Sequence, residues 1–147
     1  MAEDKMTAKE YLSQYITAGG EIEALLDEVQ RLRSLAEKTT MSFENDGGAP
    51  GTRKTDKIPE AIEKIMEIES EIGNRVSALA ILRIDIYNTI CKVPDGKSRV
   101  LLLKRYIANL QFERIAYDMG YTYKHITHNL HPAALEEVDK ILQKDAP

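Results

Sequence analysis

Three histidines follow one another at intervals of three residues near the C-terminal end of the chain: His125, His128 and His131. Imidazole is a common zinc ligand, and residues three or four apart share one side of a helix, so a metal site is considered first. His131, however, falls well round a helix from His125, and no cysteine or acid in the same stretch completes a tetrahedral set. We therefore expect no metal and no other cofactor.

Residue types that could support catalysis are scattered along the chain. The sequence contains no glycine-rich phosphate loop, serine nucleophile elbow or HExxH pattern. Its acids in the first two thirds alternate with lysine and arginine, which is typical of solvated helix faces. The single cysteine, Cys91, is expected to be a buried, unreactive thiol. These patterns predict that the protein is not an enzyme.

Residues 112–131 read FERIAYDMGYTYKHITHNLH and have the pattern of a helix-turn-helix. Ile115 would lie on the inner face of the first helix. Gly120 suits a turn that needs a left-handed backbone, and Thr122 is a good N-cap for the second helix. Ile126 would anchor that second helix inward. The same pattern also fits an αα-corner within a small helical domain, which is the alternative interpretation.

The outward side of the second helix carries groups that could contact DNA. With Ile126 inward, about 100° per residue places Lys124, His128 and His131 opposite to it and Thr127 to one side. Lysine neutralises phosphate, while histidine and threonine hydrogen-bond phosphates or base edges. The expected DNA-contacting residues are Thr122, Lys124, Thr127, His128 and His131, with Lys104, Arg105 and Arg114 near the phosphate backbone.

The charge distribution agrees with an anionic partner. The whole chain has a net charge of −4, yet residues 97–131 carry six lysines and arginines against two acids. A basic segment in an otherwise acidic chain favours duplex DNA as partner. The alternative is a solvated surface whose neutralising acids lie nearby in space.

Two long amphipathic segments precede the motif and would position it. Thr7 and Glu10 form a capping box that begins the first helix, in which apolar residues recur every three or four positions from Ile22. Gly19-Gly20 could kink it. The second helix is expected to open with Pro59 in its first turn and to run for about 35 residues. The two seams could pair within one chain, as an antiparallel coiled-coil-like hairpin, or with a second subunit.

The expected organisation is therefore all-α. A helical hairpin spans residues 1–93, with a flexible connector near 40–57 that contains the run NDGGAPG, and a helix-turn-helix domain spans 94–147. No apolar run is long enough for a membrane span, and the N-terminus lacks the apolar stretch of a secretory signal. We expect a cytoplasmic protein without a membrane partner.

The chain resembles a family of small proteins from phages and prophages of Gram-positive bacteria. The resemblance lies in MTAKEYL, EVQRLRSLAEKTT and IPEAIEKIMEIESEI, and in RVLLLKRYIANLQFERIAYDMGYTYKHI. The last stretch is also similar to region four of sigma factors and to phage late-gene activators of the ArpU and RinA type. The resemblance implies transcription regulation in a bacterial host cell.

The leading hypothesis is a phage-derived transcriptional regulator that reads duplex DNA with its helix-turn-helix. The hairpin would form a homo-oligomer, with a dimer favoured, or would dock a partner such as RNA polymerase. A second hypothesis is a small terminase-like packaging protein, which would assemble as a ring of many subunits. A third is a helical interaction protein that does not bind DNA.

Overall fold

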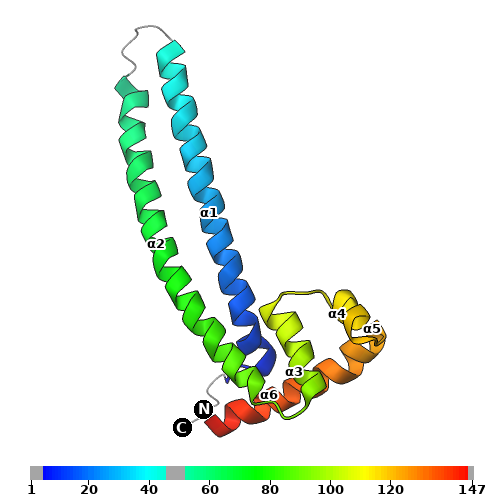
Figure 1. Ribbon diagram of the computed structural model, residues 1–147. Coiled ribbons are helices and arrows are strands. Elements are labelled where there is room, and N and C mark those ends of the chain that lie inside the picture. The colour runs from blue at the N-terminus through cyan, green and yellow to red at the C-terminus, as the bar shows by residue number, and fades with distance from the viewer. Residues whose placement is uncertain (1–4, 46–51, 146–147) are drawn as a thin grey trace. The chain divides into compact units, whose positions relative to one another are not determined.

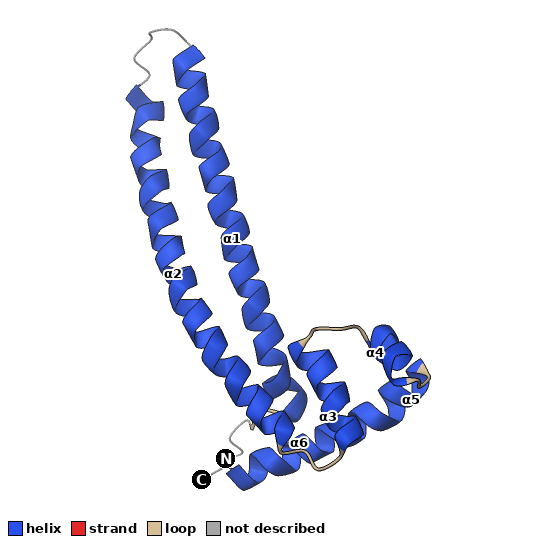
Figure 2. Ribbon diagram, in the orientation of Figure 1, coloured by secondary structure: helices blue, strands red, loops and turns tan. Residues whose placement is uncertain are grey.

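The computed structural model of the chain describes residues 5–45 and 52–145, and every regular element in these ranges is helical (Figure 2). Along the chain (Figure 1) the elements are α1 (Ala8–Asn45), α2 (Thr52–Cys91), α3 (Gly96–Leu102), η1 (Leu103–Ile107), α4 (Phe112–Met119), α5 (Tyr123–His125), η2 (Ile126–Leu130) and α6 (His131–Asp145), where η marks a π-helical segment. The all-α fold is confirmed, and α1 and α2 pack against each other as an antiparallel hairpin.

The described residues form two compact units. Unit 1 contains the chain up to Ala18 and from Leu79 onward, and unit 2 contains Gly19–Ala78. The expected domain boundary near residue 93 thus falls inside unit 1. The first turns of α1 and the last turns of α2 belong to the same core as the C-terminal helices.

Unit 2 is a two-helix segment with one narrow seam. The seam residues are spaced alternately three and four apart, as in a heptad repeat. They are Ile22, Leu25, Val29, Leu32, Ala36 and Thr39 on α1, and Ile58, Ala61, Ile65, Ile68, Ile72 and Arg75 on α2. Val29, Ile65 and Ile68 are buried in its centre. Apolar spacing in the sequence identified this seam except for its polar members, Thr39 and Arg75.

Two boundaries of the hairpin differ from the expectation. The α1 helix continues through Gly19-Gly20 without a break and extends to Asn45, while α2 begins at Thr52, so only residues 46–51 of the expected connector lie outside the described residues. Pro59 consequently lies inside α2, not in its first turn. Proline has no amide hydrogen, so α2 lacks one helical hydrogen bond at this position. The sequence pattern had taken the same proline as a sign that the helix starts there.

Unit 1 begins with the capping box that the sequence predicts. Glu10 N donates to Thr7 Oγ1 and Thr7 N donates to Glu10 Oε2, both at 3.2 Å. The amide of Ala8 donates to Asp139 Oδ1 on α6 at 2.9 Å, so the start of α1 is held against the last helix of the chain. Capping therefore contributes to tertiary structure here as well as to the helix end.

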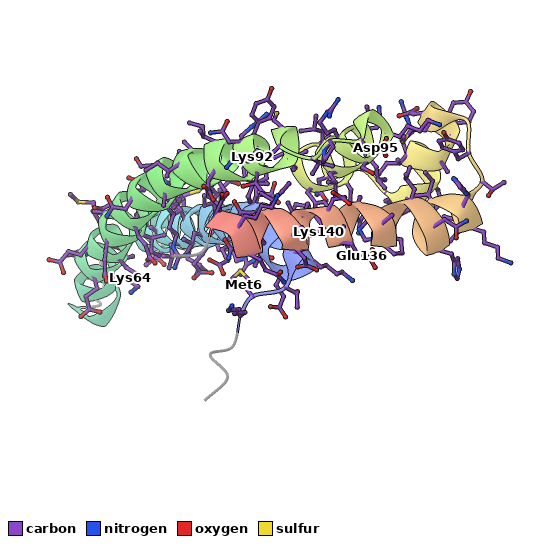
Figure 3. The ribbon with its side chains drawn as sticks, turned by 90° about the horizontal axis from the view of Figure 1, so that it is seen from below. Met6, Lys64, Lys92, Asp95, Glu136 and Lys140 are labelled. Atoms are coloured by element: carbon purple, nitrogen blue, oxygen red, sulfur yellow. The ribbon has the colours of Figure 1, made fainter. Side chains whose placement is uncertain are left out.

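The core of unit 1 draws on most of its helices. Its buried residues are Ala8 and Leu12 on α1, Ile86 and Ile90 on α2, Val93 in the turn after α2, Leu101 and Leu102 on α3, Tyr106 on η1, Ile115 and Ala116 on α4, Ile126 on η2, and Ala134 and Val138 on α6. The outer side of α6 is polar, as Glu136 and Lys140 show (Figure 3). This core positions the helix-turn-helix.

The turn between α2 and α3 is fixed by polar contacts. Asp95 (labelled in Figure 3) caps α3 by accepting from Ser98 N at 3.2 Å, and Arg99 donates to the carbonyls of Val93 and Pro94 at 2.6 and 2.9 Å. Cys91, at the end of α2, is exposed. The expectation that this thiol is buried is wrong, because Ile90 and Val93 occupy the inward positions on either side of it.

Candidate nucleic-acid interface

The turn between α4 and α5 has the backbone geometry that a helix-turn-helix requires. Gly120 has φ 74° and ψ 29°, the left-handed conformation that terminates α4. Its amide donates to the carbonyl of Tyr117 at 3.3 Å, and that of Tyr121 donates to the carbonyl of Ala116 at 2.9 Å. These bonds satisfy the last carbonyls of α4 and turn the chain.

The second helix starts at the residue that the sequence predicts. Thr122 is its N-cap, and its Oγ1 accepts from the amide of His125 at 3.1 Å. Ile126 has no exposed surface and Ile115 faces it from α4, also with none. The predicted inward face is therefore confirmed, and Thr122 has a structural role whether or not it also contacts a ligand.

Two of the expected contact residues are free to meet a partner. Lys124 and His128 are exposed, and Lys124 takes part in no ion pair within residues 5–45 and 52–145. Thr127 is half-buried, and its hydroxyl donates back to the carbonyl of Tyr123 at 3.0 Å. Its lone pairs remain available to accept a hydrogen bond, whereas its proton is already used.

His131 is buried, and its expected outward placement is wrong. The side chain is 9% exposed, its Nε2 lies 2.7 Å from the hydroxyl of Tyr106, and its ring packs edge-on against Phe112 at 4.9 Å between centroids. Burial lowers the pKa of His131 to about 4, and the nearby charges of Lys9 and Arg105 act in the same direction. This histidine is neutral and structural.

The π-helical segment explains the error. The amide of His131 donates to the carbonyl of Ile126, five residues back, where an α-helix would use the residue four back. In a regular helix two residues five apart diverge by about 140°, but this wider turn brings His131 onto the side of Ile126. The segment ends at Leu130, two residues before Pro132, whose ring would clash in a regular α-helix with the carbonyl four residues earlier.

The three cations expected near the DNA backbone are all partly engaged. Lys104 and Arg114 both contact Asp118, at 3.4 and 3.1 Å. Partial desolvation would raise the pKa of Asp118, but the hydrogen bonds from Arg114 and Lys104 outweigh it and lower that pKa. Arg105 lies over the ring of Phe112 at 4.3 Å and donates to the carbonyl of Leu110 at 3.0 Å. Asp118 thus offsets part of the positive charge of this region.

Sequence reasoning missed the tyrosines around the turn. Tyr117 is 84% exposed on α4, and Tyr123 is 51% exposed at the start of α5. Lys97 lies over the ring of Tyr121 at 5.6 Å, which brings a further cation from α3 to the turn. Phenolic hydroxyls are good donors to phosphate oxygens. The repeated tyrosines of YDMGYTY were the available signal.

Neither a metal centre nor a membrane-spanning helix emerges from the part of the chain that the structure describes. Within it, no three histidines, cysteines or acids are grouped so that they could hold a metal ion. His125 instead lies 3.1 Å from the amide nitrogen of Asn129 through its Nδ1. No helix in the same part is both long and apolar enough to cross a bilayer.

Comparisons with family models, with curated proteins and with solved structures yield no match to this chain.

Proposed function

We propose that the protein binds duplex DNA through the helix-turn-helix of α4 and the helix that begins at Tyr123, and that it regulates transcription. The observation that carries this proposal is the combination of the left-handed turn at Gly120 with the Thr122 cap. Together they start a helix whose first turns expose Lys124 and His128 while Ile126 is buried.

The exposed groups divide into those that would hold the DNA phosphates and those that would contact base edges. Lys124 lies in the first turn of the second helix, where the helix dipole and free amides also favour a phosphate. His128 is one turn further on and is suited to a base edge. Arg114 and Lys104, both paired with Asp118, would contact the backbone by exchanging Asp118 for phosphate or by sharing their remaining donors. His131 has no part in this proposal.

The remaining functional expectations are proposals of the same kind. A regulator of this design would act in the cytoplasm of a bacterial host and would contact RNA polymerase or a second copy of itself through the α1–α2 hairpin. Exposed apolar side chains on the hairpin, such as Leu26 and Met66, support the idea that it meets another protein.

The proposal is tested by fluorescence titration of labelled duplexes, taken from upstream DNA of the protein's own genome and from random sequence, at low and physiological salt. Affinity should fall steeply with salt because phosphate contacts release counterions. Lys124→Glu should weaken binding to both duplexes and reduce the salt slope by about one unit or more. His128→Ala should cost about 1 to 3 kcal/mol on the preferred site and little on random DNA.

Lys140→Glu is the matched control. This lysine carries the same charge and is also exposed, although it pairs with Glu137 at 3.3 Å, and it lies on α6, sixteen residues beyond Lys124 on the same run of helix, or about 24 Å away. It should change binding much less than Lys124→Glu does. No binding at low salt, or equal effects of the two substitutions, would refute the interface as placed here.

A further inference from the structure

Unit 2 carries large apolar side chains outside its seam. Leu26 is 49% exposed, Ile62 49%, Met66 64% and Val76 48%. Single exposed apolar residues are ordinary on protein surfaces, whereas a contiguous group marks a contact surface. Whether these four form a group depends on which side of the hairpin each one occupies.

An ion pair between the two helices places them on one side. Arg33 of α1 and Glu69 of α2 are in contact. Leu26 precedes Arg33 by seven residues, while Ile62 precedes Glu69 and Val76 follows it by the same interval. Residues seven apart return to the same side of a paired helix, so all five lie on the side that the ion pair marks.

Further residues extend this surface. Thr40, seven residues after Arg33, lines a surface hollow of about 360 Å³ together with Ile62. Met66 follows Ile62 by one turn. A methyl group added at Gly73, seven residues after Met66, would meet nothing within 4 Å, so the surface is open there. We name Leu26, Arg33, Thr40, Ile62, Met66, Glu69, Gly73 and Val76 the second face of the hairpin.

We propose that a second copy of the chain docks on the second face, related by a two-fold axis parallel to α1 and α2. Such an axis lays α1 of one copy over α2 of the other at the same level along the hairpin. Leu26 then meets Val76 of the second copy, and Arg33 meets Glu69 of the second copy. The face is thus complementary to itself in both apolar contact and charge.

Other two-fold arrangements are less favourable. A two-fold axis perpendicular to α1 and α2, in the plane of the interface, would lay α1 over α1 and α2 over α2. Centred on the ion pair, it would set Arg33 against Arg33 and Glu69 against Glu69. Like charges in contact across an interface cost affinity. The proposal deepens one of the two hairpin contacts proposed above, the one with a second copy, and it does not depend on DNA binding, because a dimer forms or fails to form without DNA.

Sedimentation velocity of the full chain over a range of micromolar concentrations gives the mass and the dimer dissociation constant. The wild type should be a dimer. Leu26→Lys should raise the dissociation constant by about tenfold or more, because it buries a charge against an apolar partner. Leu35→Lys is the matched control on the same helix: Leu35 is 59% exposed and lies nine residues on, about 180° round from Leu26. It should leave the dissociation constant nearly unchanged.

A charge exchange tests the pairing itself. Arg33→Glu and Glu69→Arg should each dissociate the dimer, since each variant would set like charges against one another. An equimolar mixture should form a heterodimer, because glutamates of one variant then face arginines of the other. Far-ultraviolet circular dichroism checks that each variant is folded, and mixing would not rescue a merely unfolded chain.

Three results would overturn the proposal. They are a monomeric wild type, equal effects of Leu26→Lys and Leu35→Lys, or separately sedimenting monomers in the mixture. None of them bears on DNA binding, which the titration with Lys124→Glu measures separately.

Discussion

Acidification should destabilise unit 1 through one buried group, His131. The unfolded chain binds a proton at this residue below about pH 6.5, whereas the folded chain binds it only near pH 4. Between these values the unfolded state holds more protons, so stability falls as the pH falls. The contribution is fully present above about pH 6.5 and is lost as the pH approaches 4.

The magnitude follows from the two pKa values. Each unit of difference corresponds to about 1.4 kcal/mol, so the complete loss is about 3.5 kcal/mol. Between pH 7.5 and pH 5 the expected loss is about 2 kcal/mol, because at pH 5 the unfolded residue is almost fully protonated and the folded one almost fully neutral. This is a large part of the stability of a small domain.

Urea unfolding at pH 7.5, 6 and 5, followed by circular dichroism, measures the loss. His131→Gln keeps an amide that can hydrogen-bond the hydroxyl of Tyr106 but does not titrate, so the stability difference between it and the wild type should change by about 2 kcal/mol over this range. His128→Gln is the control, because His128 is exposed. If the difference in unfolding free energy between the wild type and His131→Gln stays constant with pH, the reasoning is refuted.

The remaining predictions concern the helix-turn-helix and its backbone, and thermal or urea unfolding measures each. Gly120→Ala should destabilise unit 1 by about 1 kcal/mol, because the backbone φ of this residue is 74°. Gly20→Ala is the comparison: it lies within helical α1, an added methyl group would meet nothing within 4 Å, and it should stabilise the chain by up to about 1 kcal/mol. An equal effect of both would contradict the left-handed turn. Thr122→Ala should cost about 1 kcal/mol through the lost cap to the amide of His125, and unchanged stability would mean that this hydrogen bond contributes nothing. Ile126→Asp should cost at least about 3 kcal/mol, since it places a charge at a position with no exposed surface, and wild-type melting would refute the inward face.

What the sequence could predict here is mainly local. Gly120, Thr122 and the capping box at Thr7 each act on backbone within a few residues, and all three were identified from residue type and position. The seam of the hairpin was equally accessible, because a heptad repeat reports burial directly. The exposure of Lys124 and His128 was also predicted, and for His128 this holds although the residue lies within the π-helical segment.

The failures have a common physical origin in features that act beyond the local pattern. His131 was misplaced because a uniform rotation per residue cannot represent the π-helical segment before Pro132. Asp118 was not expected to hold Lys104, since that pairing depends on how η1 and α4 meet, whereas its pairing with Arg114 is a local i,i+4 contact within α4. The membership of Leu12 in the core of unit 1 depends on contacts with residues near the opposite end of the sequence.

The hydrogen bond between the start of α1 and α6 has a consequence for how the chain folds during synthesis. The amide of Ala8 donates to Asp139, 131 positions later, so the core of unit 1 cannot close until the chain through α6 has left the ribosome. Closing so long a loop directly would carry a large entropy cost. The α1–α2 hairpin reduces this entropy cost. Once α1 and α2 have paired, the hydroxyl of Tyr11 lies 3.0 Å from that of Thr89. The segment still to be enclosed is then only the C-terminal part of the chain. Growth of the nascent chain and pairing of α1 with α2 would therefore proceed in the same order, and the proposed DNA-binding surface would be completed last.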